Sequence, residues 1–178
     1  MAKINKSQFA ILGMLSLSPM SGYEIRRAME KSTNHFWKES DGQLYPTLEK
    51  LVKENKIACQ QVRRQGARKS KIYALTPEGK EALMQWLLDP DYVISIRSEF
   101  MLKIFFGGNA DPLVTRALIE GFYVQQKQQM QMLEQARIRL GEKDPSLKKH
   151  LPYWKSCVRF AELRIRANLQ WCEEMLAL

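Results

Sequence analysis

The chain has 178 residues, of which 28 are Lys or Arg and 19 are Asp or Glu, so its formal net charge is +9. Its three separated cysteines form no CxxC pair, which argues against a disulfide framework and a zinc site, and no apolar run approaches the roughly 20 residues that cross a bilayer. We therefore expect a cytoplasmic protein with no metal, no cofactor and no membrane partner.

The positive charge belongs mainly to the first half of the chain. Residues 1–86 hold 15 Lys and Arg against 8 Asp and Glu, whereas residues 87–178 hold 13 against 11. A basic half suits a polyanionic partner such as nucleic acid, although membranes and acidic proteins also bind basic surfaces.

Two helices are predicted before residue 35. Ser7 can cap the first, whose apolar residues recur at helical spacing until Ser18–Pro19 ends it. Ser21 and Glu24 have the spacing of a reciprocal capping box, which is a strong signal for the start of the second helix.

A third helix is predicted to begin at Ser40 and to end at Asn55, a residue that adopts the left-handed conformation of helix C-termini almost as glycine does. One stripe of this helix is apolar and predicted to be buried: Leu44, Leu48, Leu51 and Val52. The opposite face has the same spacing, with a tyrosine at its edge: Gln43, Tyr45, Pro46, Thr47 and Lys50.

A β-hairpin is predicted next, with strands over 57–62 and 71–76 and a charged, flexible tip, RRQGARKS, between them. No acidic residue lies between Asn55 and Pro77, and the basic ones are Lys56, Arg63, Arg64, Arg68, Lys69 and Lys71. Thr76 as N-cap and Pro77 as first helical residue then begin a fourth helix.

The linker DPDY at 89–92 divides two predicted domains, 1–89 and 90–178. The second domain is predicted to be all-helical, with a short helix within 97–106, a long one from 112 to 141 and a last one near the C-terminus. The last helix carries an apolar seam close to a heptad repeat, which indicates a long partner helix and which we assign to dimerisation. The seam residues are Leu151, Trp154, Val158, Ala161, Ile165, Leu169, Cys172 and Leu176.

Three helices, a hairpin and a following helix have the element order of a winged helix-turn-helix. The predicted fold is therefore mainly α: an N-terminal winged helix-turn-helix with a short β-hairpin wing, plus an all-helical C-terminal dimerisation domain. In winged folds the third helix enters the major groove of DNA and the hairpin reaches the flanking backbone or the minor groove. Gln and Thr can read bases, Lys can reach guanine or phosphate, and Tyr can bond phosphate. The expected DNA contacts are Gln43, Tyr45, Pro46, Thr47, Lys50, Arg63, Arg64, Arg68 and Lys69.

Four segments carry a family resemblance: FAILGMLSLSPMSGYEI, FWKESDGQLYPTLEKLVKEN, KIYALTPEGKEAL and SEFMLKIFF. They resemble the PadR family of bacterial transcriptional regulators over most of residues 8–106. The length beyond is similar to the subgroup with a large C-terminal helical domain, which includes virulence-gene activators. Asn55 stands where the family usually has glycine.

The resemblance implies a homodimer with interlocking C-terminal helices that binds a roughly palindromic operator in double-stranded DNA. It also implies a repressor that a small aromatic effector, such as a phenolic acid, releases from DNA. The C-terminal helices carry no motif that matches an effector site, so the effector-binding residues are left unassigned.

Other functions fit the sequence less well. Neither histidine has a catalytic partner at a recognisable spacing, and an enzyme acting on nucleic acid would need carboxylates for metal ions, which the basic hairpin lacks. We therefore expect no enzyme and assign no catalytic residue. Two alternatives stay open: a winged-helix adaptor for protein contacts, and a transcriptional activator of the same family.

Overall fold

A computed structural model of the chain describes residues 6–33, 36–37, 40–65, 68–92, 94, 97–141 and 145–177. Side chains are described at these positions except 41, 60–69, 139–141 and 145–146. The chain divides into two compact units, Met1–Tyr92 and Val93–Leu178, so the division lies three residues beyond the boundary expected from the sequence. Among the described residues, no helix combines the length and the apolar character needed to span a bilayer.

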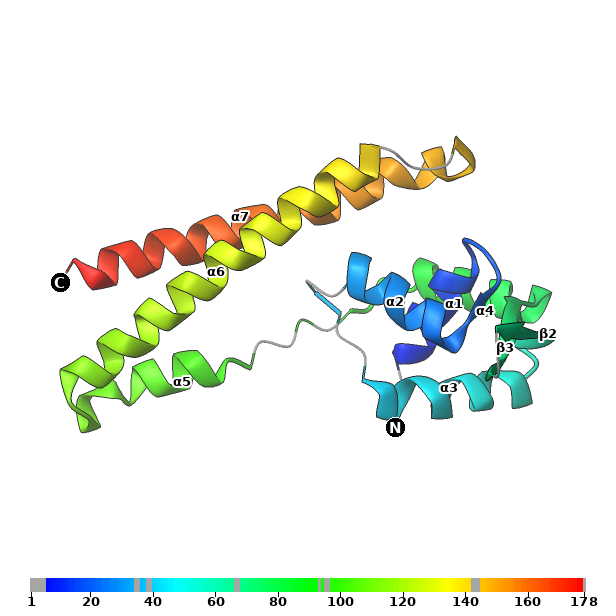
Figure 1. The fold of residues 1–178 in the computed structure, drawn as a ribbon, viewed down its shortest axis with the longest axis horizontal. Coiled ribbons are helices and arrows are strands. Elements are labelled where there is room, and N and C mark those ends of the chain that lie inside the picture. The colour runs from blue at the N-terminus through cyan, green and yellow to red at the C-terminus, as the bar shows by residue number, and fades with distance from the viewer. Residues whose placement is uncertain are drawn as a thin grey trace. The chain divides into compact units, whose positions relative to one another are not determined.

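The described residues of the N-terminal unit form four helices (Figure 1): α1 (Ser7–Leu15), α2 (Gly22–Ser32), α3 (Asp41–Lys53) and α4 (Pro77–Leu88). Their apolar stripes meet in one core, in which the leucines of α3 are fully buried, as predicted. The most deeply buried side chains are Ile11, Leu12, Ile25, Leu44, Leu48, Leu51 and Ile57.

A three-stranded antiparallel sheet completes this unit. Strands β2 (Ile57–Gln65) and β3 (Arg68–Leu75) form the predicted hairpin, which we call the wing. A short strand that sequence reasoning missed, β1 (Met20–Ser21), pairs with the other edge of β3, so the strand order is β1-β3-β2. Because Ser21 is also the N-cap of α2, this pairing fixes the start of α2 against the base of the wing.

The caps predicted for α2 and α4 are confirmed. The Ser21 Oγ accepts the Glu24 N–H, and the Glu24 carboxylate accepts the Ser21 N–H at 2.7 Å. The Thr76 Oγ1 accepts the Gly79 N–H at 3.0 Å. The cap predicted for α1 is wrong, because Lys6 is the N-cap and Ser7 lies inside the helix, where it is buried.

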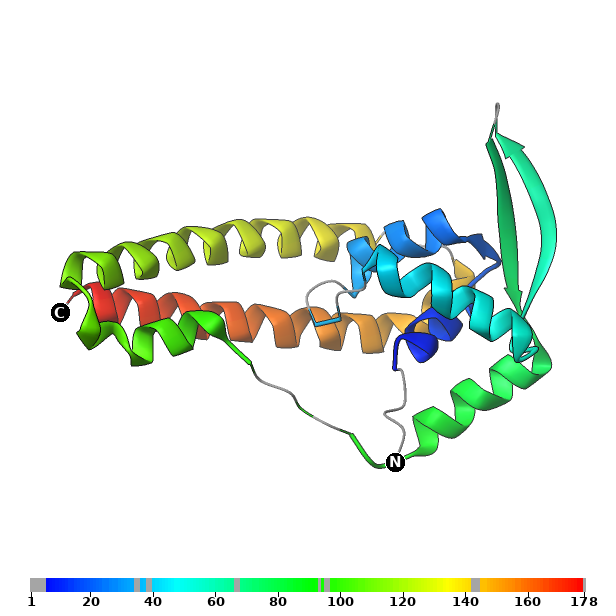
Figure 2. The same cartoon turned by 90° about the horizontal axis from the view of Figure 1, so that it is seen from below.

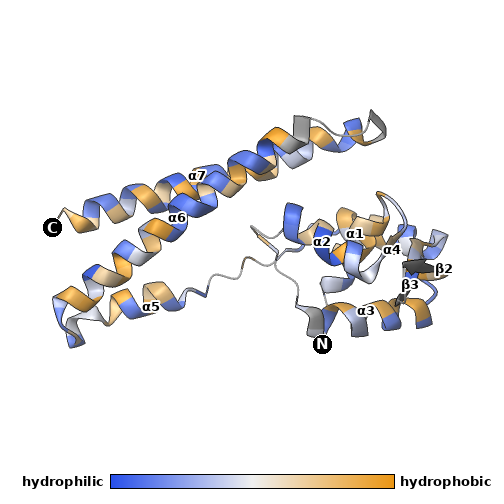
Figure 3. Cartoon of the chain, in the orientation of Figure 1, coloured by the Kyte–Doolittle hydropathy of each residue, from blue (hydrophilic) through white to orange (hydrophobic). Residues whose placement is uncertain are grey.

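The C-terminal unit is helical, as predicted: α5 (Glu99–Phe105), the 3-10 helix η1 (Gly107–Asn109), α6 (Pro112–Gly141), the 3-10 helix η2 (Pro145–His150) and α7 (Leu151–Leu176). Figures 1 and 2 both show α6 and α7 side by side and antiparallel. Figure 3 shows that apolar and polar residues alternate along both helices, as is expected where each buries one face.

The apolar seam of α7 packs against α6 of the same chain. Leu133 of α6 forms a buried cluster with Ala161 and Ile165 of α7, and Val158 and Leu169 pack against this cluster. A long partner helix for the middle of the seam therefore exists within the chain, and the assignment of the seam to dimerisation stays a prediction.

Polar contacts cross the same helix pair. The Asn168 amide donates to the Gln126 Oε1 at 3.0 Å, and the residue Gln126 is only 3% exposed. The Tyr123 hydroxyl donates to the Glu173 carboxylate at 3.1 Å. A partly buried polar pair beside an apolar seam favours one register of two helices, because sliding would leave its polar atoms without partners.

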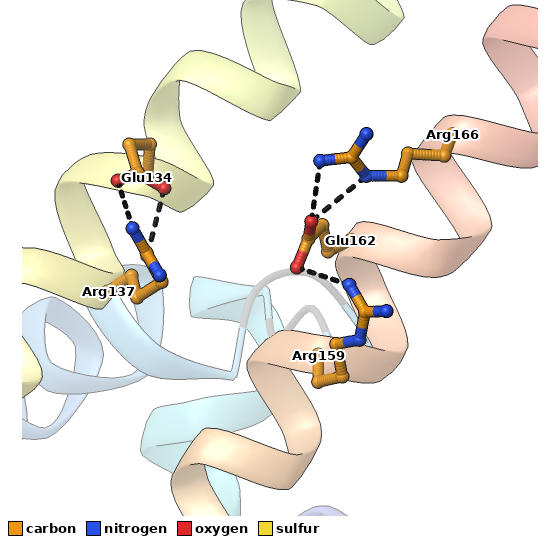
Figure 4. Close-up of polar contacts among 5 residues, drawn as sticks. All are labelled: Glu134, Arg137, Arg159, Glu162 and Arg166. Carbon is orange, nitrogen blue, oxygen red and sulfur yellow. Dashed lines mark hydrogen bonds and ion pairs between the residues drawn. The ribbon is translucent and has the colours of Figure 1, made fainter.

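Ion pairs lie on the surface of α6 and α7 (Figure 4). The Glu162 carboxylate contacts Arg159 at 3.0 Å and Arg166 at 2.8 Å, and Arg137 contacts Glu134 at 2.8 Å. Hydrogen bonds from Arg159 and Arg166 hold the pKa of Glu162 below its ordinary value. Pairs within one exposed helix contribute little each, since water and salt screen them.

Candidate nucleic-acid interface

The outer face of α3 presents most of the polar residues that the sequence assigned to it. Gln43, Pro46 and Lys50 are exposed, and Tyr45 is 49% exposed. The Lys50 ammonium lies 3.6 Å from the Glu54 carboxylate one turn further on. Such a weak surface pair leaves the ammonium able to exchange its partner for a phosphate.

Thr47 is placed differently from the prediction. It is only 4% exposed, and its hydroxyl donates to the Gln43 carbonyl at 2.6 Å. The reason is its spacing, since 44, 47, 48 and 51 complete the i, i+3, i+4, i+7 pattern of the buried face. Thr47 therefore belongs to the inner side of α3, and its hydroxyl does not face a base.

Tyr45 rests on the first turn of α2. A Cβ built on Gly22 would lie 2.9 Å from the Tyr45 Cε1 and 3.3 Å from a Leu48 methyl carbon, so the missing side chain of Gly22 makes room for the ring. Sequence reasoning missed this contact, because nothing in the spacing of Gly22 and Tyr45 links the two helices. The ring is thus held at the edge of the exposed face of α3.

The wing is longer than the sequence predicted. Arg63 pairs with Ser70, Arg64 with Lys69 and Gln65 with Arg68, so residues expected in a loose tip are strand residues. Their side chains, those of Arg63, Arg64, Arg68 and Lys69, lie outside the described residues. Figure 2 shows the hairpin projecting from the helices of its own unit.

The end of α3 is closed by a hydrogen-bonded motif that the sequence predicted in part. Asn55 has a φ of 53°, which confirms the left-handed conformation expected there. The Lys56 N–H donates to the Leu51 carbonyl and the Asn55 N–H donates to the Val52 carbonyl. These two bonds form a Schellman motif, which normally places glycine at the left-handed position.

The same turn is joined to the residue that follows the second strand of the wing. The Thr76 hydroxyl donates to the Asn55 carbonyl at 2.6 Å, and the Thr76 N–H donates to the Lys56 carbonyl at 3.2 Å. A Cβ on Gly79 would lie only 1.9 Å from the Lys56 carbonyl oxygen, so α4 approaches this turn as closely as glycine allows. We call Asn55, Lys56, Thr76 and Gly79 the wing clasp.

Tyr73 lies on β3, near the base of the wing. It faces Cys59 across the β2–β3 pair and is 8% exposed. Burial raises the pKa of its hydroxyl, and the acidic groups of Cys59, Glu49 and Tyr45 raise it further. The phenol therefore stays neutral, which suits a side chain that packs in the core.

Comparison with known proteins finds a family model that matches each unit. Residues 11–85 match the model of the transcriptional regulator PadR-like family, and residues 96–178 match the model of the virulence activator alpha C-terminal domain. The chain is 34% identical over 100 residues to the negative transcriptional regulator PadR of Bacillus subtilis, a match that covers 56% of this chain and 55% of that protein. The sequence match thus spans about half the length of that relative.

Solved structures resemble the chain over nearly its whole length. Bacillus subtilis PadR in complex with operator DNA has a TM-score of 0.79 and 28% identity, covering 96% of this chain and 97% of that one. The same regulator in complex with p-coumaric acid has a TM-score of 0.75 and 26% identity, covering 96% of each chain. These relatives are transcriptional regulators and not enzymes. The winged unit thus matches the PadR-like family of transcriptional regulators, and the helical unit matches the C-terminal domain of virulence activators.

Proposed function

We propose that the chain binds double-stranded DNA sequence-specifically, as a homodimer on a roughly palindromic operator. The observation that carries this proposal is the winged unit itself, in which an exposed polar face of α3 adjoins a hairpin with basic residues and no acidic ones. The likeness to an operator-bound regulator at 28% identity supports the same conclusion.

Within this proposal the residues divide by task. Gln43 and Lys50 contact base edges, and Tyr45 and Pro46 line the groove beside the phosphates. The wing contacts the backbone through its basic residues, Arg63, Arg64, Arg68 and Lys69. Thr47 is left out of this set, since it is buried.

Because α6 of the same chain buries the middle of the seam, we propose a further surface for the dimer. Large apolar side chains are exposed where α5, η1 and the start of α6 meet: Met101, Leu102, Phe105, Phe106, Leu113 and Val114. Soluble proteins rarely leave such a group uncovered. A second copy of this chain covers this surface in the proposed dimer.

We also propose that the chain represses transcription and is released from DNA by a small aromatic effector such as a phenolic acid. This rests on the complex of Bacillus subtilis PadR with p-coumaric acid and on the role of that relative as a negative transcriptional regulator. An activator of the same family is the alternative outcome.

The test is selection of genomic fragments of the source organism by the purified protein at physiological salt. A recovered fragment should bind at least about a thousand times more tightly than a random duplex of equal length, as specific regulators do. Equal affinity for both duplexes would exclude the proposal. Adding p-coumaric acid and other phenolic acids to the specific complex tests the effector, and reporter expression from the recovered promoter decides between repression and activation.

A further inference from the structure

The wing joins the rest of its unit at its base, where β1 pairs with β3 and where both ends of the hairpin meet. β2 begins at Ile57, directly after the turn that ends α3, and β3 ends at Leu75, directly before the cap of α4. Ile57 and Leu75 are paired with each other. The geometry of this junction therefore helps to set the direction in which the wing points.

The hydrogen bonds across this junction are made by backbone atoms and the Thr76 hydroxyl. Thr76 donates its hydroxyl to the Asn55 carbonyl at 2.6 Å and its N–H to the Lys56 carbonyl at 3.2 Å, while its Oγ1 accepts the Gly79 N–H at 3.0 Å. The same hydroxyl therefore bonds both the turn at the end of α3 and the first turn of α4. An ordinary N-cap needs only the acceptor, so the bond to Asn55 is additional to capping.

The length of the hairpin makes this attachment matter. Eight strand residues at about 3.3 Å each carry the wing about 26 Å from its base, so a turn of about 10° at the base moves the far end by roughly 4–5 Å. That displacement exceeds the reach of a hydrogen bond. Contacts near the far end of the wing consequently depend on groups at its base.

We propose that the Thr76 hydroxyl is the positioning group of the wing: by bonding the Asn55 carbonyl it aims the basic hairpin at the DNA backbone relative to α3. This inference rests on the proposed DNA binding. Thr76 itself touches no DNA in it, and the phosphate contacts are made by the wing.

The experiment compares Thr76→Gly with Thr76→Ser in the full-length protein. Gly is tolerated at an N-cap at a cost of only a few tenths of a kcal/mol relative to the polar caps, but it removes the bond to Asn55, whereas Ser keeps both hydroxyl bonds. Affinity is measured over a range of salt concentrations for a duplex recovered from genomic DNA and for a random duplex. The logarithm of the association constant K falls linearly with the logarithm of the salt concentration, and each phosphate that the protein neutralises adds about 0.9 to the steepness of this slope.

We expect Thr76→Ser to behave as the wild type. Thr76→Gly should bind both duplexes at least about tenfold more weakly, with a slope shallower by about one or more, because each lost phosphate contact removes about 0.9 from the slope. The ratio of the two affinities should be unchanged, since α3 keeps its place. Arg64→Ala provides the reference for a lost wing contact and should also make the slope shallower.

Three results would overturn the inference: equal slopes for Thr76→Gly and Thr76→Ser, a fall in the affinity ratio together with the slope, or an unchanged slope in Arg64→Ala. Failure of the proposed function can be told apart from failure of this inference. In that case the wild type would bind no genomic duplex more tightly than the random one, while the salt dependence of binding to the random duplex would still measure the phosphate contacts of the wing.

A second variant allows the test to be made even if the first variant does not fold. If Thr76→Gly is unfolded by circular dichroism, Thr76→Asp replaces it, because Asp caps helices well but has no proton to donate to Asn55. Lys80→Met, which changes the net charge by the same amount one turn along α4, is its control. A slope for Thr76→Asp equal to that of Lys80→Met would also overturn the inference.

Discussion

At the scale of single residues, two polar side chains one turn apart on α3 have different roles: one is available to contact a base, and the other packs in the core. Gln43 is exposed, whereas Thr47, one turn further on, is buried and bonded to the Gln43 carbonyl. The polar side chain of Gln43 can meet a base edge in bidentate fashion, while that of Thr47 is already used within the helix.

Replacement of Gln43 should therefore change sequence preference, and replacement of Thr47 should not. Gln43→Ala should lower the discrimination between the selected operator and single-base variants by about 1–3 kcal/mol at one position. Thr47→Val keeps the shape of the side chain and should leave that discrimination as it is. Competition binding with a panel of operator variants measures both, and loss of discrimination in Thr47→Val would place its hydroxyl against DNA after all.

A second residue-scale prediction concerns the wing clasp. Gly79→Ala would place a Cβ at 1.9 Å from the Lys56 carbonyl oxygen, so the backbone of the clasp must move, and we expect a loss of stability of at least about 2 kcal/mol. The matched control is Gly13→Ala inside α1, where nothing lies within 4 Å of an added Cβ. That change should be neutral or should stabilise by up to about 1 kcal/mol, because alanine favours helix. Urea unfolding of both variants tests the pair.

At the scale of the helices, the ion pairs of α7 should make the folding stability of the protein depend on pH. The pKa of Glu162 is lowered by Arg159 and Arg166, so its stabilising effect is present above the ordinary value of 4.5 and is lost as the pH falls through the lower value of the folded state. Glu162→Gln should lower the melting temperature slightly near neutral pH, and the difference from wild type should vanish in acid and shrink in 1 M salt. A difference that persisted in acid would contradict this account.

The sequence predicted the elements better than their partners. The helices and the turn at Asn55 follow from local signals, namely apolar spacing, caps and a residue able to adopt positive φ. The buried place of Thr47 could have been derived from its spacing to the leucines, but its polarity suggested the opposite face. The seam of α7 shows a limit of another kind, because a heptad pattern indicates that a partner helix exists without saying which chain supplies it.

The DNA contacts themselves are still predictions. Spacing identified an exposed face on α3, but the reach of a side chain into a groove depends on the angle at which the helix is held, which no local pattern encodes. The contact of Tyr45 with Gly22 and the clasp at Thr76 both join segments far apart in the sequence. Such contacts follow from the assembled fold and cannot be inferred from periodicity.

For the whole molecule, the proposed dimer depends on the exposed apolar residues of α5 and the start of α6. Phe105 is 79% exposed, so Phe105→Glu should not disturb the fold of the chain but should place two carboxylates in the subunit interface. We expect sedimentation velocity to show a dimer for the wild type and a monomer for the variant at micromolar concentration. Phe160→Glu, on the exposed side of α7, is the control and should stay dimeric; a dimer in both variants would place the interface elsewhere.

The aromatic contacts of the two units give the protein built-in optical reporters. Of the four tryptophans, Trp37 and Trp86 belong to the N-terminal unit, where Trp86 stacks on Phe9 at 4.8 Å. Trp154 and Trp171 belong to the C-terminal unit, where Trp154 stacks on His150 and Trp171 meets Phe100 edge-on. Replacing one pair by phenylalanine leaves a protein whose fluorescence follows a single unit. Melting curves of the two single-pair proteins would then reveal whether the units unfold together or in succession.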